Sequence, residues 1–135
     1  MLKVPTYLAP SPIHGTGVYT AVPISEGTVV WEYDSPVDWE IPPEEMARIP
    51  EPYQTRLRHF SYLDESGLYV LCGDNAKFMN HSFEPNCDDS GRTTVAARDI
   101  AAHEELTCDY RSFDLESREG APAGLRGHWR LEAAG

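Results

Sequence analysis

Short runs of β-branched and aromatic residues, separated by turns that contain glycine or proline, dominate the first half of the chain. Residues 1–12 contain three prolines and are predicted to form an extended lead-in, because proline fixes the backbone and removes a hydrogen-bond donor. Two β-rich runs follow at 18–22 and 28–33. Residues 61–64 and 68–72 flank a Glu-Ser-Gly turn, which is typical of a β-hairpin. The pattern therefore predicts a mainly β domain.

The segment 34–60 interrupts this pattern with closely spaced prolines and two runs of helical character. Residues 43–49 are predicted to form one short helix with proline at its first position, where the missing N–H has no helical partner to lose. Residues 53–60 are predicted to add one or two further helical turns. We expect this segment to be an insert between the strands on either side.

The second half of the chain predicts strands at 93–98 and 105–108, with a turn at 88–92 before the first of them. The connection between these two strands begins with Ala97-x-x-Ile100. It echoes Ala21-x-x-Ile24, which begins an earlier turn. We interpret both as the same strand–turn–strand device and not as a repeat array.

Length and charge limit the classes of function. The 135 residues suffice for one domain with its own core. The chain carries 22 acidic and 11 basic residues, for a formal net charge of −11. This balance disfavours binding to nucleic acid or to an anionic membrane, since both require clustered lysine and arginine. It suits a basic protein partner attracted over long range, although plain solubility accounts for it equally well.

Targeting segments and metal motifs are not evident in the sequence. No apolar stretch is long enough to span a bilayer, and the N-terminus lacks the apolar core of a signal peptide. A cytoplasmic location is therefore expected. Cys72, Cys87 and Cys108 show no C-x-x-C spacing, which favours free thiols over disulfides. We expect no metal, because no two candidate ligands have a recognised zinc spacing.

The stretch 75–87 has neither a helix period nor a strand period and concentrates several chemically active side chains. It changes from the apolar pair Phe78-Met79 to Asn80-His81-Ser82, and Pro85-Asn86 prevents a simple helical continuation. Polar residues between apolar flanks are typical of a half-buried binding loop. A surface turn with asparagine caps is the alternative for this stretch alone, and the polar stretch 105–110 weighs against it.

Three motifs, in this order, resemble the signature of the SET-domain protein lysine methyltransferases. They are His14-Gly-Thr-Gly17, Lys77-Phe-Met-Asn-His-Ser-Phe-Glu-Pro-Asn-Cys87 and Glu105-Leu-Thr-Cys-Asp-Tyr110. The resemblance covers about residues 7–114. It implies a mainly β SET-domain (β-clip-like) fold of small twisted sheets, with short helical inserts and a C-terminal pseudoknot that places Tyr110 beside Asn80. It also implies a SET domain over 1–114, with a variable insert at about 34–60, and a C-terminal tail over 115–135.

The resemblance further implies an S-adenosyl-L-methionine-dependent protein-lysine N-methyltransferase that acts on a basic, lysine-containing protein or peptide. Tyr110 is then the residue whose hydroxyl lies beside the transferring methyl group, and Tyr62 lines the channel for the substrate lysine. Core packing is the alternative role of each tyrosine. Cys108 stands where related enzymes often have phenylalanine or tyrosine, so we expect the number of methyl groups transferred not to depend on a phenol at this position.

The same resemblance implies a cofactor site made from the early glycine turn, the Asn-His pair and two later aromatic residues. Its expected members are Gly15, Gly17, Val18, Tyr19, Asn80, His81, Tyr110 and Trp129. Trp129 is included as a candidate lid, because no cysteine follows Cys108 and the zinc-binding C-terminal segment of many relatives is absent from this sequence. The alternatives are that the glycines only serve a hairpin, that His81 is structural and that Trp129 packs elsewhere.

Two other functions remain open at this level. The first is a catalytically weak module that keeps the fold in order to bind a peptide or protein. The absent zinc segment and the short insert favour that module, whereas the intact Asn80, His81 and Tyr110 favour the enzyme. The second is a zinc-binding structural domain. The sequence does not identify the protein substrate.

Overall fold

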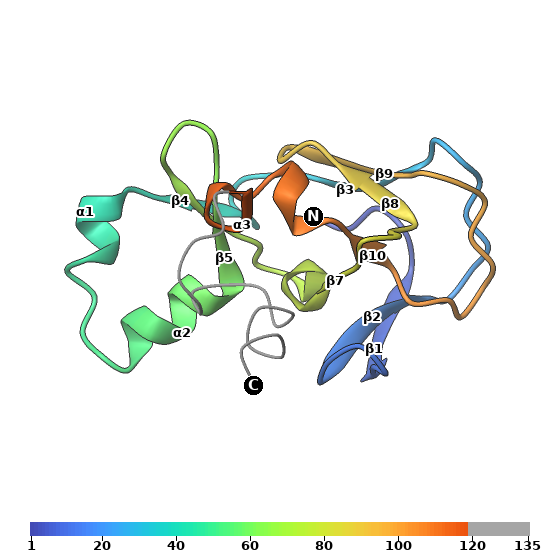
Figure 1. Cartoon of the computed structure of the whole chain (residues 1–135), viewed down its shortest axis with the longest axis horizontal. Coiled ribbons are helices and arrows are strands. Elements are labelled where there is room, and N and C mark those ends of the chain that lie inside the picture. Colours follow the sequence, from blue (N-terminus) through green and yellow to red (C-terminus); the bar gives the residue numbers. More distant parts are fainter. Residues whose placement is uncertain (119–135) are drawn as a thin grey trace.

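The computed structural model describes residues 1–118 and shows small sheets joined by loops and short helices (Figure 1). Within these residues there are four sheets, two of two strands and two of three. The predicted mainly β class is therefore confirmed.

The N-terminal hairpin pairs β1 (Thr6–Pro10) with β2 (Thr16–Thr20) in antiparallel register. The predicted extended lead-in is confirmed, because it supplies the first strand of this hairpin. Gly15 has a φ of +45° in the connecting turn, a left-handed conformation that glycine adopts without steric cost. Val18 is completely buried, whereas its cross-strand partner Leu8 is exposed, so the hairpin covers the core with β2.

A second sheet has the order β3–β9–β8 and is antiparallel throughout. Its strands are β3 (Val29–Glu32), β8 (Cys87–Asp89) and β9 (Thr93–Ala96). The predicted strands at β3 and β9 are confirmed, but the predicted turn at 88–92 begins too early. Two aspartates favour a turn there, yet the fully buried Cys87 pairs with Ala96 and extends the strand to Asp89. Burial of one residue thus overrides the local propensity of the next two.

A third sheet has the order β4–β6–β5, with β4 (Trp39–Ile41), β5 (Ser61–Leu63) and β6 (Tyr69–Leu71). The predicted hairpin of β5 and β6 is confirmed, and it places Tyr62 opposite Val70. The sequence does not predict β4. This edge strand has three residues and an exposed Trp39, so its sequence carries no measurable period.

Both helices expected in the insert are present. α1 (Pro43–Met46) begins with proline at its first position and buries Met46, whereas α2 (Tyr53–Phe60) buries no residue. Figure 1 shows them together at one end of the molecule, away from the β1–β2 hairpin. Because α2 runs directly into β5, the insert fixes the start of the strand that carries Tyr62.

Short helical turns flank the two strands of the central motifs. The 3₁₀ helix η1 (Asn75–Phe78) leads into β7 (Asn80–His81), and β10 (Thr107–Cys108) leads into the 3₁₀ helix η2 (Tyr110–Ser112) and α3 (Leu115–Arg118). These alternations of turn and very short strand explain why the sequence shows no regular period there.

Pairings between distant segments close the fold. β10 lies parallel to β7, with Thr107 opposite Asn80, so the two central motifs are side by side. Ile24 and Ile100 exchange two backbone hydrogen bonds of 2.8 Å. The two Ala-x-x-Ile turns that echo each other in the sequence therefore pair with each other in the structure.

The core draws apolar residues from all parts of the described chain. Its most buried members include Val18, Val30, Val70, Ile100 and Leu106. The three cysteines are free and buried, as expected, and burial raises the pKa of the Cys87 thiol to about 12. Across residues 1–118, no helix has the length and apolar character needed to cross a membrane.

Candidate functional site

Asn80 occupies the first position of β7 and is completely buried. Its Nδ2 donates to the carbonyl oxygens of His14 at 3.1 Å and Thr16 at 3.3 Å, and to Oε2 of Glu105 at 2.9 Å. Its Oδ1 is also buried and has no hydrogen-bond partner among residues 1–118. The amide thus uses its donor end to hold the N-terminal turn, and its acceptor end is left to receive a donor from outside these residues.

Glu105 lies on the far side of this cluster. Its carboxylate accepts from Ser11 Oγ at 2.8 Å as well as from Asn80. Gly17 packs so closely against it that a Cβ atom there would lie 2.3 Å from Glu105 Oε2. A side chain at residue 17 would therefore displace the Glu105 carboxylate from its present position, whereas the positive φ of residue 15 favours glycine there. We call the group of Ser11, residues 14–17, Asn80 and Glu105 the Asn80 cradle.

His81 is held by the C-terminal motif. Its Nδ1 accepts the backbone N–H of Tyr110 at 3.0 Å, so a neutral ring carries its proton on Nε2. The ring packs edge-on against Phe83, with centroids 4.4 Å apart. The Asp109 carboxylate lies 3.8 Å from Nδ1 and is bound by Arg111, whose hydrogen bonds hold the pKa of Asp109 below its ordinary value.

Tyr110 joins this polar region to the apolar interior. It is almost completely buried, and its hydroxyl donates to the Met79 carbonyl oxygen at 2.6 Å. The centroid of its ring lies 5.2 Å from the centroid of the His81 ring and 5.8 Å from that of the Phe113 ring. Hydrogen bonds at its backbone N–H and its hydroxyl thus fix Tyr110 against the residues on either side of Asn80, as the expected pseudoknot requires.

Tyr62 approaches the same region from β5. Its hydroxyl donates to the Gly91 carbonyl oxygen at 2.5 Å, and its ring meets Phe113 edge-on at 4.9 Å. Tyr62 and Tyr110 therefore pack on the same phenylalanine. A cavity of about 20 Å³ lies at this point, and its walls include Tyr62, Met79, Cys108 and Phe113. We call it the aromatic cavity.

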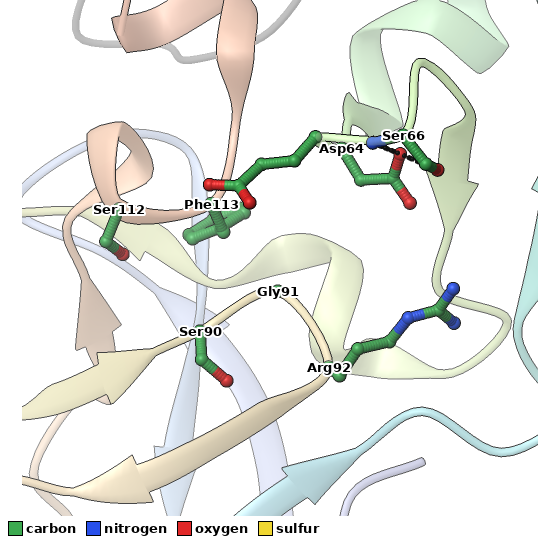
Figure 2. A pocket seen from close by; sticks show the side chains of 8 residues that line it. Asp64, Ser66, Ser90, Gly91, Arg92, Ser112 and Phe113 are labelled. Atoms are coloured by element: carbon green, nitrogen blue, oxygen red, sulfur yellow. Dashed lines mark hydrogen bonds between the residues drawn. The ribbon is translucent and has the colours of Figure 1, made fainter.

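A larger pocket of about 220 Å³ adjoins the aromatic cavity, since Phe113 lines both. Figure 2 shows Asp64, from the β5–β6 turn, on one side of this pocket and Arg92, from the β8–β9 turn, on another. Gly91, whose carbonyl accepts the Tyr62 hydroxyl, is part of its wall. We call it the outer pocket, and Phe113 and Gly91 separate it from Tyr62.

Val18 and Tyr19 take structural positions in β2. The Val18 side chain lies in the core, and its carbonyl accepts the N–H of Leu106 at 2.7 Å. Tyr19 stacks on Tyr7 with centroids 5.7 Å apart and donates its hydroxyl to Pro10 at 2.7 Å. Burial and a nearby carboxylate raise the pKa of Tyr19. Both side chains are committed to the hairpin and the core, and a cofactor contact by either stays a prediction.

Sequence reasoning gave no role to three residues of the site: Ser11, Glu105 and Phe113. Glu105 opens the E-L-x-x-D-Y motif, so a signal for it was present, whereas Ser11 approaches it only through folding. Trp129, the candidate lid, lies outside the described residues. In the part of the chain that the structure describes, no three His, Cys, Asp or Glu side chains are grouped to hold a metal ion.

The protein is a β domain of small sheets in which the strand of Asn80 and His81 lies beside the strand that leads into Asp109 and Tyr110. Residues 15–111 match the family model of the SET domain, and the chain belongs to that family. It is 35% identical, over an alignment of 147 positions, to the H3 lysine-4 specific histone-lysine N-methyltransferase of Yarrowia lipolytica. The alignment covers 93% of this chain and 12% of that protein. It is 34% identical over 119 residues to histone-lysine N-methyltransferase ash1 of Drosophila melanogaster, covering 80% of this chain and 5% of that protein.

A solved structure supports the fold independently. The chain aligns with a chain of apo ctPRC2 carrying two mutations in Ezh2, with a TM-score of 0.66 and 22% identity, covering 87% of this chain and 16% of that one. The expected SET-domain fold is thereby confirmed. The chain spans only 2% to 13% of the length of the curated relatives it matches.

Proposed function

We propose that this chain is an S-adenosyl-L-methionine-dependent protein-lysine N-methyltransferase. One observation carries the proposal: Tyr110 is fixed between the Asn80 cradle and the aromatic cavity by hydrogen bonds to His81 and Met79. Tyr110 thus contacts the neighbours of Asn80 on one side and, on the other, Phe113, which lines the aromatic cavity. Family membership and relatives named as histone-lysine N-methyltransferases support the same reaction.

The Asn80 cradle fits the amino-acid end of the donor. Asn80 Oδ1 is a buried acceptor without a partner among the described residues, and the ammonium group of S-adenosylmethionine is a donor. When bound, this cofactor supplies an activated methyl group on a sulfonium sulfur. Asn80 then holds the cofactor without adding a charge, and Gly15, which has open space where a Cβ would lie, leaves room for the backbone to approach it.

The aromatic cavity fits the acceptor amine. A free lysine has a pKa of about 10.4 and is mostly charged at neutral pH, whereas the reaction requires its neutral form. Tyr62, Cys108 and Phe113 present apolar and aromatic surface to the amine, which lowers its pKa by disfavouring the charge, whereas the Asp89 carboxylate in the same wall acts in the opposite direction. Tyr110 orients the nitrogen, and orientation of this kind contributes on the order of 7–11 kcal/mol in well-aligned reactions.

The substrate we propose is a basic, lysine-containing protein segment that enters through the outer pocket. Asp64 and Glu65 line this pocket, and the guanidinium of Arg92 in its wall is bound by Glu40. These carboxylates and the net charge of −11 favour a cationic partner. Because the relatives are named for histone lysine, histone tail peptides are the first substrates to test.

A binding module with little catalysis is the second candidate. It is favoured by the complete burial of Asn80 and by the small size of the aromatic cavity, about 20 Å³, both of which restrict access to reacting groups. In that case the outer pocket holds a basic partner and no methyl group moves.

Calorimetric titration of S-adenosylmethionine into the wild type, Asn80→Ala and Tyr110→Phe separates these candidates. We expect the wild type to bind, Asn80→Ala to bind about tenfold or more weakly because a buried acceptor is lost, and Tyr110→Phe to bind essentially as the wild type does. With a histone peptide and a labelled donor, Tyr110→Phe should lower kcat by about 10²- to 10⁴-fold.

The two assays fail in different ways. Cofactor binding without transfer to any lysine-containing peptide moves the binding module ahead. A wild type that binds no S-adenosylmethionine at all contradicts the methyltransferase.

A further inference from the structure

We infer that Glu105 is a positioning residue for the cofactor site, because its carboxylate holds the Asn80 amide with the oxygen turned away from the N-terminal turn. This inference rests on the proposed function, since it concerns the same site. It assigns a specific task to the first residue of the E-L-x-x-D-Y motif, which acts on the cofactor region through Asn80 and through the glycine turn.

The orientation of the Asn80 amide is dictated by its surroundings. Three acceptors face its nitrogen: two backbone carbonyl oxygens of residues 14 and 16 and the Glu105 carboxylate, at 2.9 to 3.3 Å. A flipped amide would place its oxygen against all three acceptors, which is repulsive. The charged acceptor contributes most, because hydrogen bonds to ionised groups are stronger than neutral ones. Glu105 therefore adds the strongest of three contacts that turn Oδ1 away from the N-terminal turn.

The same carboxylate also fixes the turn that approaches the cofactor. Ser11 Oγ donates to Glu105 and accepts the N–H of Ile13 at 3.0 Å, so the carboxylate is linked to the turn backbone through one hydroxyl. Gly17 lies against the carboxylate with no room for a side chain. One side chain thus holds the Asn80 amide and the glycine turn in fixed relation to each other.

The preceding residue offers a matched control. Glu104 has the same side chain and is one position away, but its carboxylate binds Arg98 and the N–H of Ala101 near the surface. Its carboxylate thus lies outside the Asn80 cradle. Glu104→Gln and Glu105→Gln remove the same charge from adjacent positions, so a difference between them reports the cradle and not the net charge.

The test measures the dissociation constant of S-adenosylmethionine by calorimetry for the wild type, Glu104→Gln, Glu105→Gln and Glu105→Ala. We expect Glu105→Ala to weaken binding by about 10- to 100-fold, the loss typical of a hydrogen bond to a charged group. Glu105→Gln keeps one oxygen that accepts from Asn80, so it should recover part of the affinity. Glu104→Gln should bind as the wild type does.

Two further measurements separate positioning from loss of structure. In steady-state assays, Glu105→Ala should raise KM for the cofactor while KM for the peptide stays unchanged, a split that a smaller folded fraction does not produce. In the cofactor-free protein, the side-chain ¹⁵N–H resonances of Asn80 should lose their protection from solvent exchange in Glu105→Ala. Ser11→Ala, which leaves Glu105 in place, should move the same quantities less and serves if Glu105→Ala does not fold.

The outcomes are distinct. If the wild type binds the cofactor and both Glu105 variants bind it as tightly as Glu104→Gln, this inference is overturned and the proposed function stands. If KM for the peptide rises as much as KM for the cofactor, Glu105 is merely structural and the inference is also overturned. If the wild type binds no cofactor, the proposed function fails and the inference fails with it.

Discussion

The Asn80 cradle and the aromatic cavity meet at adjacent residues of the chain, but the cradle is held by polar contacts and the cavity is lined mainly by apolar and aromatic side chains. Met79 lines the cavity, and Asn80, the next residue, anchors the cradle. In the cradle, directed hydrogen bonds join Asn80, Glu105 and Ser11, and a Cβ atom at Gly17 would collide with the carboxylate. At the cavity, the Phe113 ring meets Tyr62 edge-on, with centroids 4.9 Å apart, and about 20 Å³ is left empty.

This difference shows how one short segment serves two partners of unlike chemistry. Successive residues of an extended chain point to opposite sides, so the change from Met79 to Asn80 also changes the environment from apolar to polar. A charged methyl donor needs directed polar contacts, and a lysine that must lose its proton needs an apolar wall. We therefore expect the cradle to tolerate substitutions less well than the cavity.

Asn80→Asp is the strongest test of the Asn80 cradle. The substitution keeps the size of the side chain but places a carboxylate oxygen where Nδ2 now lies 2.9 Å from Glu105. A buried carboxylate at residue 80 in contact with the partly buried Glu105 carboxylate should lower the free energy of unfolding by about 2–4 kcal/mol at neutral pH. Chemical denaturation measures this loss.

The pH dependence of the same variant identifies the cause. Acid protonates one carboxylate and restores a donor between residues 80 and 105, so the deficit should shrink as the pH falls. Asn75→Asp is the control, because Asn75 is exposed on η1 and should change stability little. Equal losses in the two variants, or a loss of Asn80→Asp that does not depend on pH, would contradict the charge repulsion.

Cys108→Phe tests the aromatic cavity, which we expect to tolerate substitution better than the cradle. Cys108 is buried at the wall of a cavity of about 20 Å³, which is too small to accept a phenyl ring without displacing Tyr62 or Phe113. We expect a loss of about 1–3 kcal/mol in the free energy of unfolding, typical of overpacking, and an unchanged cofactor affinity. Mass spectrometry of a methylated substrate then shows whether the number of methyl groups changes. A loss of cofactor binding would show that the cavity and the cradle are not separate.

Asp109→Asn tests the border between the two regions and should have the smallest effect. Hydrogen bonds from Arg111 lower the pKa of Asp109 below its ordinary value of 3.8. A carboxyl with a lowered folded pKa stabilises the protein above its ordinary pKa, and that contribution disappears as the pH falls through the folded pKa. Because the pair is partly exposed, we expect a difference below about 1 kcal/mol near neutral pH.

The measurement is the stability of wild type minus Asp109→Asn across the acidic range. The difference should be largest at neutral pH and should vanish below the folded pKa of Asp109. A difference that stays constant down to acid would mean that the carboxylate charge plays no part.

Local chemistry made much of the fold predictable. Glycine and proline positions marked the β1–β2 and β5–β6 hairpins, and Pro43 marked the start of α1, because each acts on its own backbone. Strand β8 was missed because the burial of Cys87, and not the turn chemistry of the aspartates, decides the conformation there. The edge strand β4 was missed because three residues carry no period.

The candidate site, too, was predictable where motifs mark its residues and not where its contacts depend on folding. Asn80, His81, Tyr62 and Tyr110 were predicted from motifs, and the structure brings Tyr110 into contact with the residues around Asn80. Ser11 was not predicted, because its contact with Glu105 depends on the closure of the chain over more than ninety positions. Phe113 was also missed, since its role as a shared wall exists only once β5 and η2 have packed together.

The parallel pairing of β7 with β10 determines when the site first exists during synthesis. The β1–β2 and β5–β6 hairpins connect near neighbours and can form while the chain is still emerging from the ribosome, at about 5–20 residues per second. The Asn80 cradle lacks its carboxylate until residue 105 is made, and the aromatic cavity lacks a wall until residue 113. A nascent chain that stalls before these positions therefore carries neither half of the site, and the ability to bind a donor and an acceptor arises in a single late step.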